Sequence, residues 1–309
     1  MAKILVTGAR GFVGSNFYES AKRRYDVVAT SLHPQESEGI MKLDITSREE
    51  ALECIRGHSP DLVVHSAACL DFGVADEEMW RINVDGTRNI VDACKAVGVE
   101  VAYISTDWVF NGSKQPGEKY REDEKPAPLN PYGLTKLEGE RIIRNSGIPH
   151  IIARPANIYG VNPIRGNRDG FAVSILRTLR RGEVVKQPDE VWQTPTLVDH
   201  LAERVLSLYA KGKRGIFHTA GADAVNRYEF FRLLAGTFSL NGELVKPSSL
   251  EDFGNSLGAR KRLNYPKNAS LAVGKVEEAL GRRQLSLAEG LRAMKAKVEQ
   301  LQLELSLEG

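Results

Sequence analysis

Cysteine is scarce in this 309-residue chain, and its three cysteines form no recognisable framework. Cys54, Cys69 and Cys94 are odd in number and show no Cys-x-x-Cys spacing, the pattern typical of zinc sites and redox pairs. We therefore expect no disulfide and no zinc site, but reduced thiols as in a cytosol.

The chain also lacks an excess of charge of one sign and any long apolar run. Its 42 basic and 40 acidic side chains give a net charge of +2, without the basic excess that nucleic-acid binding requires. No run approaches the ~20 apolar residues that span a bilayer, and the N-terminus enters the run Ile4 to Val6 without a signal-peptide segment. We expect a cytoplasmic protein with no nucleic-acid or membrane partner.

Short β-branched runs alternate with longer helical patterns through the first half of the chain. Strands that are almost wholly apolar are buried on both faces, as in a parallel sheet between two helix layers. The pattern predicts an α/β fold with a Rossmann-type, doubly wound parallel sheet. The expected strands contain Ile4 to Val6, Val27 to Ala29, Leu62 to His65, Val101 to Ile104 and Ile151 to Ala153.

This alternation breaks in the second half of the chain. A loop rich in Gly, Pro and Asn, Gly160 to Arg168, precedes a helical pattern, Phe171 to Arg180, and residues 215–221 read as a strand returning to the sheet. We therefore expect an NAD(P)-binding domain over 1–159 and a smaller, interleaved substrate-binding portion over 160–309. An apolar stripe in the last helix is expected to pack against its own domain, with a partner helix as the alternative. The stripe comprises Leu287, Leu291, Met294, Val298, Leu301 and Leu305.

Three glycines after the first strand predict a dinucleotide site. Gly8, Gly11 and Gly14 lie where this strand turns into the first helix, so they permit a tight turn and a close approach of backbone N–H groups to a pyrophosphate. Asp44, at the expected end of a third strand, is placed to accept from adenine, and small residues at the end of the fourth strand leave space. The expected contacts are Gly8, Arg10, Gly11, Phe12, Val13, Gly14, Ser31, His33, Asp44, Ile45, Ser66, Ala67 and Ala68.

The chain lacks the acidic residue that NAD-preferring sites place after the second strand, about 20 residues beyond the glycines. The segment from Val27 to His33 contains no carboxylate, so a 2′-phosphate would meet no repulsion there. Arg10, inside the glycine turn, matches phosphate oxygens with its guanidinium. NADP is therefore the expected cofactor, and NAD is the alternative.

A tyrosine and a lysine four residues apart carry the predicted chemistry. Tyr132 and Lys136 share one helix face, and the lysine cation is expected to lower the pKa of the phenol from about 10 toward neutrality. Thr106 ends the fifth strand, at the sheet edge where open α/β folds bind ligands, so its hydroxyl is expected to bind a substrate carbonyl. Tyr132 would deliver a proton and Lys136 would hold the nicotinamide ribose, so both also count as cofactor contacts.

Several motifs resemble the extended short-chain dehydrogenase/reductase superfamily and, within it, the dTDP-4-dehydrorhamnose reductase family. The superfamily features are the glycine turn, the stretch Asn83 to Thr87, and Tyr132 with Lys136. The family signature Ser-Thr-Asp-Tyr-Val-Phe-Asp-Gly is similar to residues 105–112, which differ from it only by a Trp and an Asn. Further similar landmarks span nearly the whole chain: Gln193 to Thr196, Gly215 to Gly221, Arg227 to Phe230 and Tyr265 to Asn268.

The resemblance implies NADPH-dependent reduction of a 4-keto group on a nucleotide-activated deoxysugar, with Thr106, Tyr132 and Lys136 in the roles given above. It also permits a homodimer. The acidic residues that bridge a metal in some members' dimers have no match here, so no metal is expected. Arg165 is a further candidate to hold a diphosphate. The expected substrate contacts are Asp107, Val109, Arg154 and Asn157.

Two other functions fit many of the same residues. Asn157 resembles the diphosphate-contacting asparagine of NAD-dependent nucleotide-sugar 4-epimerases, which keep their cofactor through oxidation and re-reduction. The regulatory subunit of methionine adenosyltransferase also resembles this family, so the fold could bind NADP without turnover. A dehydratase is disfavoured, because Trp108 stands where those enzymes carry the glutamate that expels water.

Overall fold

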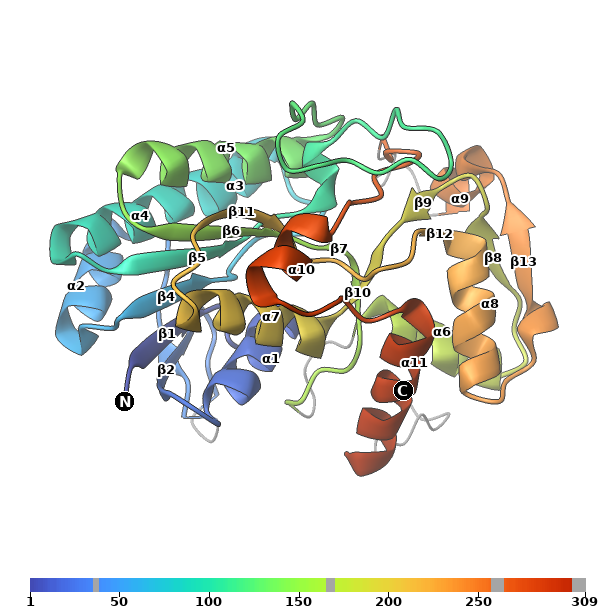
Figure 1. Cartoon of the computed structure of the whole chain (residues 1–309), viewed down its shortest axis with the longest axis horizontal. Helices are drawn as coiled ribbons and strands as arrows, with labels where there is room; N and C mark the ends of the chain where they lie inside the picture. Colours follow the sequence, from blue (N-terminus) through green and yellow to red (C-terminus); the bar gives the residue numbers. More distant parts are fainter. Residues whose placement is uncertain (36–38, 165–169, 257–263, 302–309) are drawn as a thin grey trace.

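One parallel sheet of seven strands organises the fold (Figure 1). Its strands are β1 Lys3–Thr7, β2 Asp26–Ser31, β3 Met41–Lys42, β4 Leu62–His65, β5 Glu100–Ile104, β6 His150–Arg154 and β11 Gly215–His218. They lie in the order β11-β6-β5-β4-β1-β2-β3, and each neighbouring pair is parallel. This confirms the predicted doubly wound architecture. The computed structural model describes residues 1–35, 39–164, 170–256 and 264–301.

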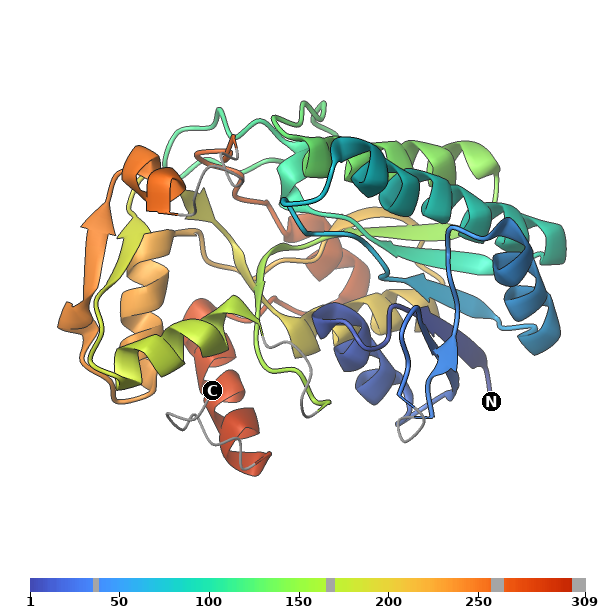
Figure 2. The same cartoon turned by 180° about the vertical axis from the view of Figure 1, so that it is seen from behind.

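Helices cover both faces of the sheet (Figures 1 and 2). One face carries α1 Phe12–Ala21, α7 Val198–Ala210 and α10 Gly274–Leu280; the other carries α2 Arg48–His58, α3 Asp76–Trp80, the π-helical turn η2 Arg81–Asp85, α4 Gly86–Val97 and α5 Pro131–Ser146. Ile4 and Val6 are buried in the core with α1 and α7, whereas Leu5 is buried in the core with α2, α4 and α5. Alternate side chains of a strand point to opposite faces, so a wholly apolar strand fills both cores.

A smaller lobe lies beyond the carboxyl ends of the central strands (Figure 1). Its helices are α6 Phe171–Arg180, α8 Arg227–Thr237, α9 Leu250–Ser256 and α11 Leu287–Gln300, with the 3-10 turn η4 Gly242–Leu244. Three short strand pairs join these helices: β7 Ala156–Tyr159 with β10 Pro195–Leu197, β9 Trp192–Gln193 with β12 Val225–Asn226, and β8 Val185–Pro188 with β13 Val245–Ser248. Leu176, Phe230, Phe231 and Leu234 are fully buried in its core.

The chain crosses between the sheet and the lobe more than once. The strand expected near 215–221 is β11, and its Ile216 pairs with Ile152 of β6, which confirms the return to the sheet. Leu201 of α7 and Val276 of α10 also belong to the core that contains Ile4. More of the segment 160–309 therefore packs on the sheet than the returning strand alone.

The last helix packs within its own chain. It begins at a capping box, in which the Ser286 hydroxyl accepts from the Glu289 N–H at 3.3 Å and the Glu289 carboxylate accepts from the Ser286 N–H at 2.8 Å. Lys297 donates to the Asn16 side-chain oxygen at 2.7 Å and forms an ion pair with Asp199, which joins α11 to α1 and α7. The expected stripe buries Leu287, Leu291, Met294 and Val298, whereas Leu305 lies outside the described residues.

Candidate active site

The glycine turn brings the backbone of β1 against the end of β4. Gly8 has φ +68°, and a Cβ on it would lie 2.8 Å from the Ala67 Cα. A Cβ on Gly14 would lie 2.2 Å from the Gly8 carbonyl oxygen, so neither position has room for a side chain. Close backbone approach at the start of α1 is what a pyrophosphate needs, because the N–H groups and the helix dipole then face it. The turn therefore fits a dinucleotide, with Phe12 and Val13 opening the helix.

Arg10 reaches the end of the neighbouring strand. Its Nη1 donates to the His33 carbonyl oxygen at 2.6 Å, just beyond Ser31, the last residue of β2. This places the guanidinium where the cofactor's adenosine ribose was expected. On the next connection, the Asp44 carboxylate accepts from the Thr46 N–H at 2.9 Å and from the Thr46 hydroxyl at 2.8 Å, and its pKa is lowered although burial opposes this.

The remaining predicted cofactor contacts lie at the same edge of the sheet, where the parallel strands end. Ile45 is buried against Gly86, where a Cβ would lie 2.8 Å from the Ile45 Cδ1. The Ser66 hydroxyl donates to the Thr7 carbonyl oxygen at 2.6 Å, so the end of β4 is fixed to β1, and Ala67 and Ala68 follow it. The structure thus brings the residues predicted from β1, β2, β3 and β4 to one edge of the sheet.

The end of β5 leads into the 3-10 helix η3, Asp107–Val109, and the predicted threonine, Thr106, caps its N-terminus. The Thr106 hydroxyl accepts from the Trp108 N–H at 3.2 Å and donates to the Asp107 carboxylate at 3.1 Å. Asp107 is 2% exposed, and burial raises its pKa to about 7. Its Oδ2 has no hydrogen-bond partner among the described residues.

Helix α5 places Tyr132 beside this turn. The Asn130 side-chain oxygen accepts from the Gly133 N–H at 2.9 Å, and Pro131 occupies the first helical position, so α5 begins one residue before Tyr132. A Cβ on Gly133 would lie 2.2 Å from the Trp108 carbonyl oxygen, which shows how tightly α5 packs on η3. Tyr132 is 8% exposed, and its ring meets the Trp108 ring of η3 edge-on.

The expected effect of Lys136 on Tyr132 needs correction. Burial and the Asp107 carboxylate raise the pKa of Tyr132 above its usual value, and Lys136 is not among the groups that shift it. Lys136 is itself buried, with its Nζ 4.0 Å from the centre of the Tyr103 ring, and burial lowers its pKa to about 7 although Glu140 opposes this. Sequence spacing put both side chains on one helix face, but the packing of α5 on β5 turns the ammonium toward Tyr103.

An aromatic wall surrounds the tyrosine. The Phe72 and Trp108 rings are stacked with centroids 5.8 Å apart, and each meets the Tyr132 ring edge-on, at 6.0 and 5.9 Å. Tyr265 packs edge-on against Trp108 at 4.9 Å. Phe72 and Tyr265 had no role in the sequence-based site, although Tyr265 lies in the landmark Tyr265 to Asn268. The Phe72 and Trp108 rings cover one side of the Tyr132 ring.

Two side chains that were predicted to contact the substrate are instead buried within the protein. The Val109 side chain is fully buried in the core, and its carbonyl oxygen accepts from the Ala127 N–H at 2.8 Å. Arg154 is 1% exposed and donates to both oxygens of Glu140, from Nε at 2.8 Å and from Nη2 at 2.6 Å. Arg154 therefore joins β6 to α5 and does not offer its charge to a diphosphate.

Asn157 lies beside an arginine that sequence reasoning had not placed in the site. Asn157 has φ +41°, an uncommon backbone for a non-glycine residue, and its side-chain oxygen accepts from the Arg227 Nη1 at 3.4 Å. The Arg227 guanidinium lies 5.3 Å from the centre of the Phe253 ring, and burial lowers its pKa. No carboxylate among the described residues pairs with Arg227, so its charge is available to an anion. Arg165 lies outside the described residues.

Residues 2–300 match the model of the RmlD substrate binding domain family. The chain belongs to this family. The family membership predicted from the sequence motifs is therefore confirmed. The described residues contain no group of three His, Cys, Asp or Glu side chains that could hold a metal ion. No helix in that part of the chain combines the length and the apolar character needed to cross a bilayer.

Similar proteins include reductases and a subunit of another enzyme. The dTDP-4-keto-6-deoxy-D-glucose reductase of Streptomyces niveus is 30% identical over 245 residues, which is 77% of this RmlD-family chain and 78% of the relative. Methionine adenosyltransferase 2 subunit beta of Pongo abelii is 28% identical over 287 residues, which is 89% of this chain and 81% of the relative. The dTDP-4-dehydrorhamnose reductase of Bacillus anthracis, solved in complex with NADP, has a TM-score of 0.82 at 26% identity and covers 96% of this chain and 100% of its own.

Proposed function

We propose that this RmlD-family chain is an NADPH-dependent reductase of a 4-keto group on a nucleotide-activated deoxysugar. The tight packing of α5 on η3 supports this best, because it brings Tyr132, a proton donor, beside the carbonyl-binding hydroxyl of Thr106 at the same edge of the sheet as the glycine turn. The names of the Streptomyces and Bacillus relatives describe the same reaction class.

Because its pKa is raised, Tyr132 is protonated at neutral pH, which is the form that a proton donor needs. A phenol that holds its proton at neutral pH can give it to the oxygen of a ketone as negative charge develops there, while the Thr106 hydroxyl binds the same oxygen. When bound, NADPH supplies the hydride that adds to the carbonyl carbon. The products balance as an alcohol and NADP, with Tyr132 regaining its proton from solvent. We assign Lys136, one helical turn beyond Tyr132, to the nicotinamide ribose, a role that requires its ammonium to turn from the Tyr103 ring toward the cofactor.

Asn157 and Arg227 fit the anionic end of the same substrate. The guanidinium lacks a carboxylate partner among the described residues and is enclosed by aromatic rings, which strengthens its attraction for a phosphate. The Asn157 side-chain nitrogen is buried and has no hydrogen-bond partner among the described residues, so it can donate to a phosphate oxygen. We therefore assign this pair to the diphosphate.

We predict that Arg10 makes the enzyme prefer NADPH over NADH. Arg10→Gln should raise the KM for NADPH about tenfold and leave that for NADH nearly unchanged, because only NADPH carries the 2′-phosphate that the guanidinium would bind. Initial rates with both cofactors measure this. Arg88→Gln, which removes an exposed arginine on α4, is the control. Equal losses with NADPH and NADH would contradict the assignment.

Purified protein incubated with nucleotide-activated 4-keto sugars and NADPH tests the reductase directly. We expect absorbance loss at the nicotinamide that requires the sugar substrate. A tightly held nicotinamide that copurifies, with interconversion of 4-hydroxy sugars and no net NADPH consumption, would instead identify a 4-epimerase. NADP binding without turnover of any such sugar would point to a non-catalytic, regulatory subunit, and the Pongo relative is named as a subunit of another enzyme.

A further inference from the structure

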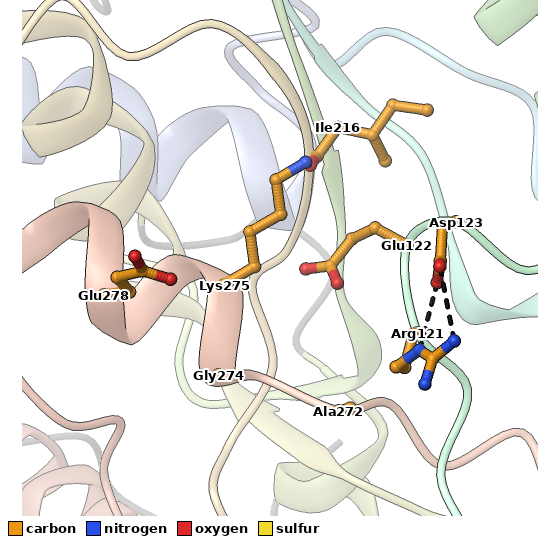
Figure 3. Close-up of a pocket in the computed structure, with 8 residues that line it drawn as sticks. All are labelled: Arg121, Glu122, Asp123, Ile216, Ala272, Gly274, Lys275 and Glu278. Carbon is orange, nitrogen blue, oxygen red and sulfur yellow. Dashed lines mark hydrogen bonds and ion pairs between the residues drawn. The ribbon is translucent and has the colours of Figure 1, made fainter.

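Two surface cavities away from Tyr132 differ in how their cations are paired. The first, of about 470 Å³, lies between the turn around Arg121 and the start of α10 (Figure 3). There Arg121 pairs with Asp123 at 3.1 Å, and Lys275 donates to the Ile216 carbonyl oxygen at 2.8 Å. Both cations that line this cavity are paired within the protein, and none of its lining side chains has a buried nitrogen without a hydrogen-bond partner among the described residues.

The second cavity, of about 760 Å³, is a groove between the C-terminal end of α1 and the length of α7, which we call the α1–α7 groove. Its lining carries more basic than acidic side chains. The basic ones are Arg23, Arg24, Arg204, Lys211 and Arg282, and the acidic ones are Asp199 and Glu203.

Arg204 of α7 is the unusual member of this set. It is only 5% exposed, and its Nη2 donates to the Arg283 carbonyl oxygen at 2.9 Å. Its Nε and Nη1 are buried without a hydrogen-bond partner among the described residues. Burial, and the like charge of Arg282, lower the pKa of Arg204. A buried guanidinium with two unused donors and no carboxylate partner is costly, and an anion that filled those donors would remove the cost.

Neither neighbouring carboxylate pairs with Arg204. Glu203 accepts from Arg282 at 2.7 Å, and Asp199 forms its ion pair with Lys297 of α11. Arg282 also donates to the Ser207 hydroxyl at 2.8 Å, and its remaining N–H groups face the groove from a side chain that is 42% exposed.

His200 faces the same groove with a buried Nε2 that also lacks a hydrogen-bond partner among the described residues. Burial and Arg204 lower the pKa of His200 to about 4, so the ring is neutral at pH 7 and its Nε2 can donate a hydrogen bond to an anion.

We propose that the α1–α7 groove binds a phosphorylated small molecule, whose phosphate oxygens accept from Arg204, Arg282 and His200. Guanidinium groups match tetrahedral oxyanions with paired N–H donors, and the surplus of cations in the lining favours a ligand with more than one negative charge. The groove lies on the α1 and α7 face of the sheet, opposite the face that α5 covers (Figures 1 and 2). It is therefore distinct from the site around Tyr132.

Inorganic pyrophosphate is the probe, titrated calorimetrically at constant ionic strength into full-length protein. Since Arg227 and the glycine turn are each expected to bind a diphosphate, the reference protein is Arg227→Gln saturated with NADP, and we expect it to retain one binding event. Adding Arg204→Met or Arg282→Gln should weaken that event at least tenfold. Adding Lys275→Gln should leave it unchanged, because that lysine is already bound to a carbonyl oxygen in the other cavity.

The Arg282→Gln variant still tests the proposal if Arg204→Met folds poorly. Its side chain is 42% exposed, so Arg282→Gln should fold normally. Pyrophosphate is expected to raise the melting temperature of the reference protein and to raise that of its Arg282→Gln derivative much less. Absence of binding to the Arg227→Gln protein would overturn the proposal. Equal affinities for the Lys275→Gln and Arg282→Gln derivatives would do the same.

Discussion

Tyr132→Phe is expected to lower the rate of sugar-dependent NADPH oxidation by about 10²-fold or more, the loss typical of removing a general acid. The substitution removes only the phenolic hydroxyl. Its ring can keep the edge-on packing against Phe72 and Trp108, so the loss would report the proton and not the fold. Steady-state rates with NADPH and the best substrate of the screen measure it.

Tyr265→Phe is the matched control for this experiment. That ring packs on Trp108 at 4.9 Å, and removing its hydroxyl takes away no group assigned to the carbonyl. We expect its rate to stay within a few-fold of the unchanged protein. NADPH binding, followed by fluorescence, should be similar for both variants. If Tyr132→Phe turned over at an undiminished rate, Tyr132 would not be the proton donor.

Glu140→Gln is expected to lower the free energy of unfolding by about 3–5 kcal/mol, because it strands a buried cation. Both side chains of the Arg154–Glu140 pair are at most 2% exposed, and Glu140 also accepts from the Ser105 hydroxyl at 2.5 Å. The amide that replaces one carboxylate oxygen cannot accept from Arg154. Urea unfolding followed by circular dichroism measures the change.

A surface ion pair on the same helix gives the comparison. Glu138 pairs with Arg141 at 3.0 Å, and the side chains are 26% and 55% exposed, so Glu138→Gln should cost less than about 1 kcal/mol. Replacing both buried partners, Glu140→Leu with Arg154→Met, should restore much of the stability that Glu140→Gln loses, since the Arg154 charge is removed together with its partner. A small loss of stability in Glu140→Gln, together with a raised KM for the sugar, would return Arg154 to the substrate site.

The fold followed from the sequence because strand burial and glycine spacing are local properties. Ile4, Leu5 and Val6 are all apolar since each faces a core, and the glycines of the first turn have no room for a Cβ. Arg154 was misplaced because its partner Glu140 lies on a helix whose packing on β6 no local pattern records. Arg227 was not predicted as a site residue for the same reason. Whether a carboxylate lies beside it depends on how the helices and strands of the lobe pack, which the local sequence does not show.

The position of β11 limits how this chain can be truncated or joined to parts of a relative in a chimera. This strand enters the sheet only after the chain has built α6 and the first strands of the lobe, and it covers the edge of β6. A fragment that ended at residue 159 would leave that edge open to pairing with other chains. A chimera that exchanged specificity with a relative would need several junctions, placed on both sides of α7 and β11, and the two lobes should unfold in one cooperative transition.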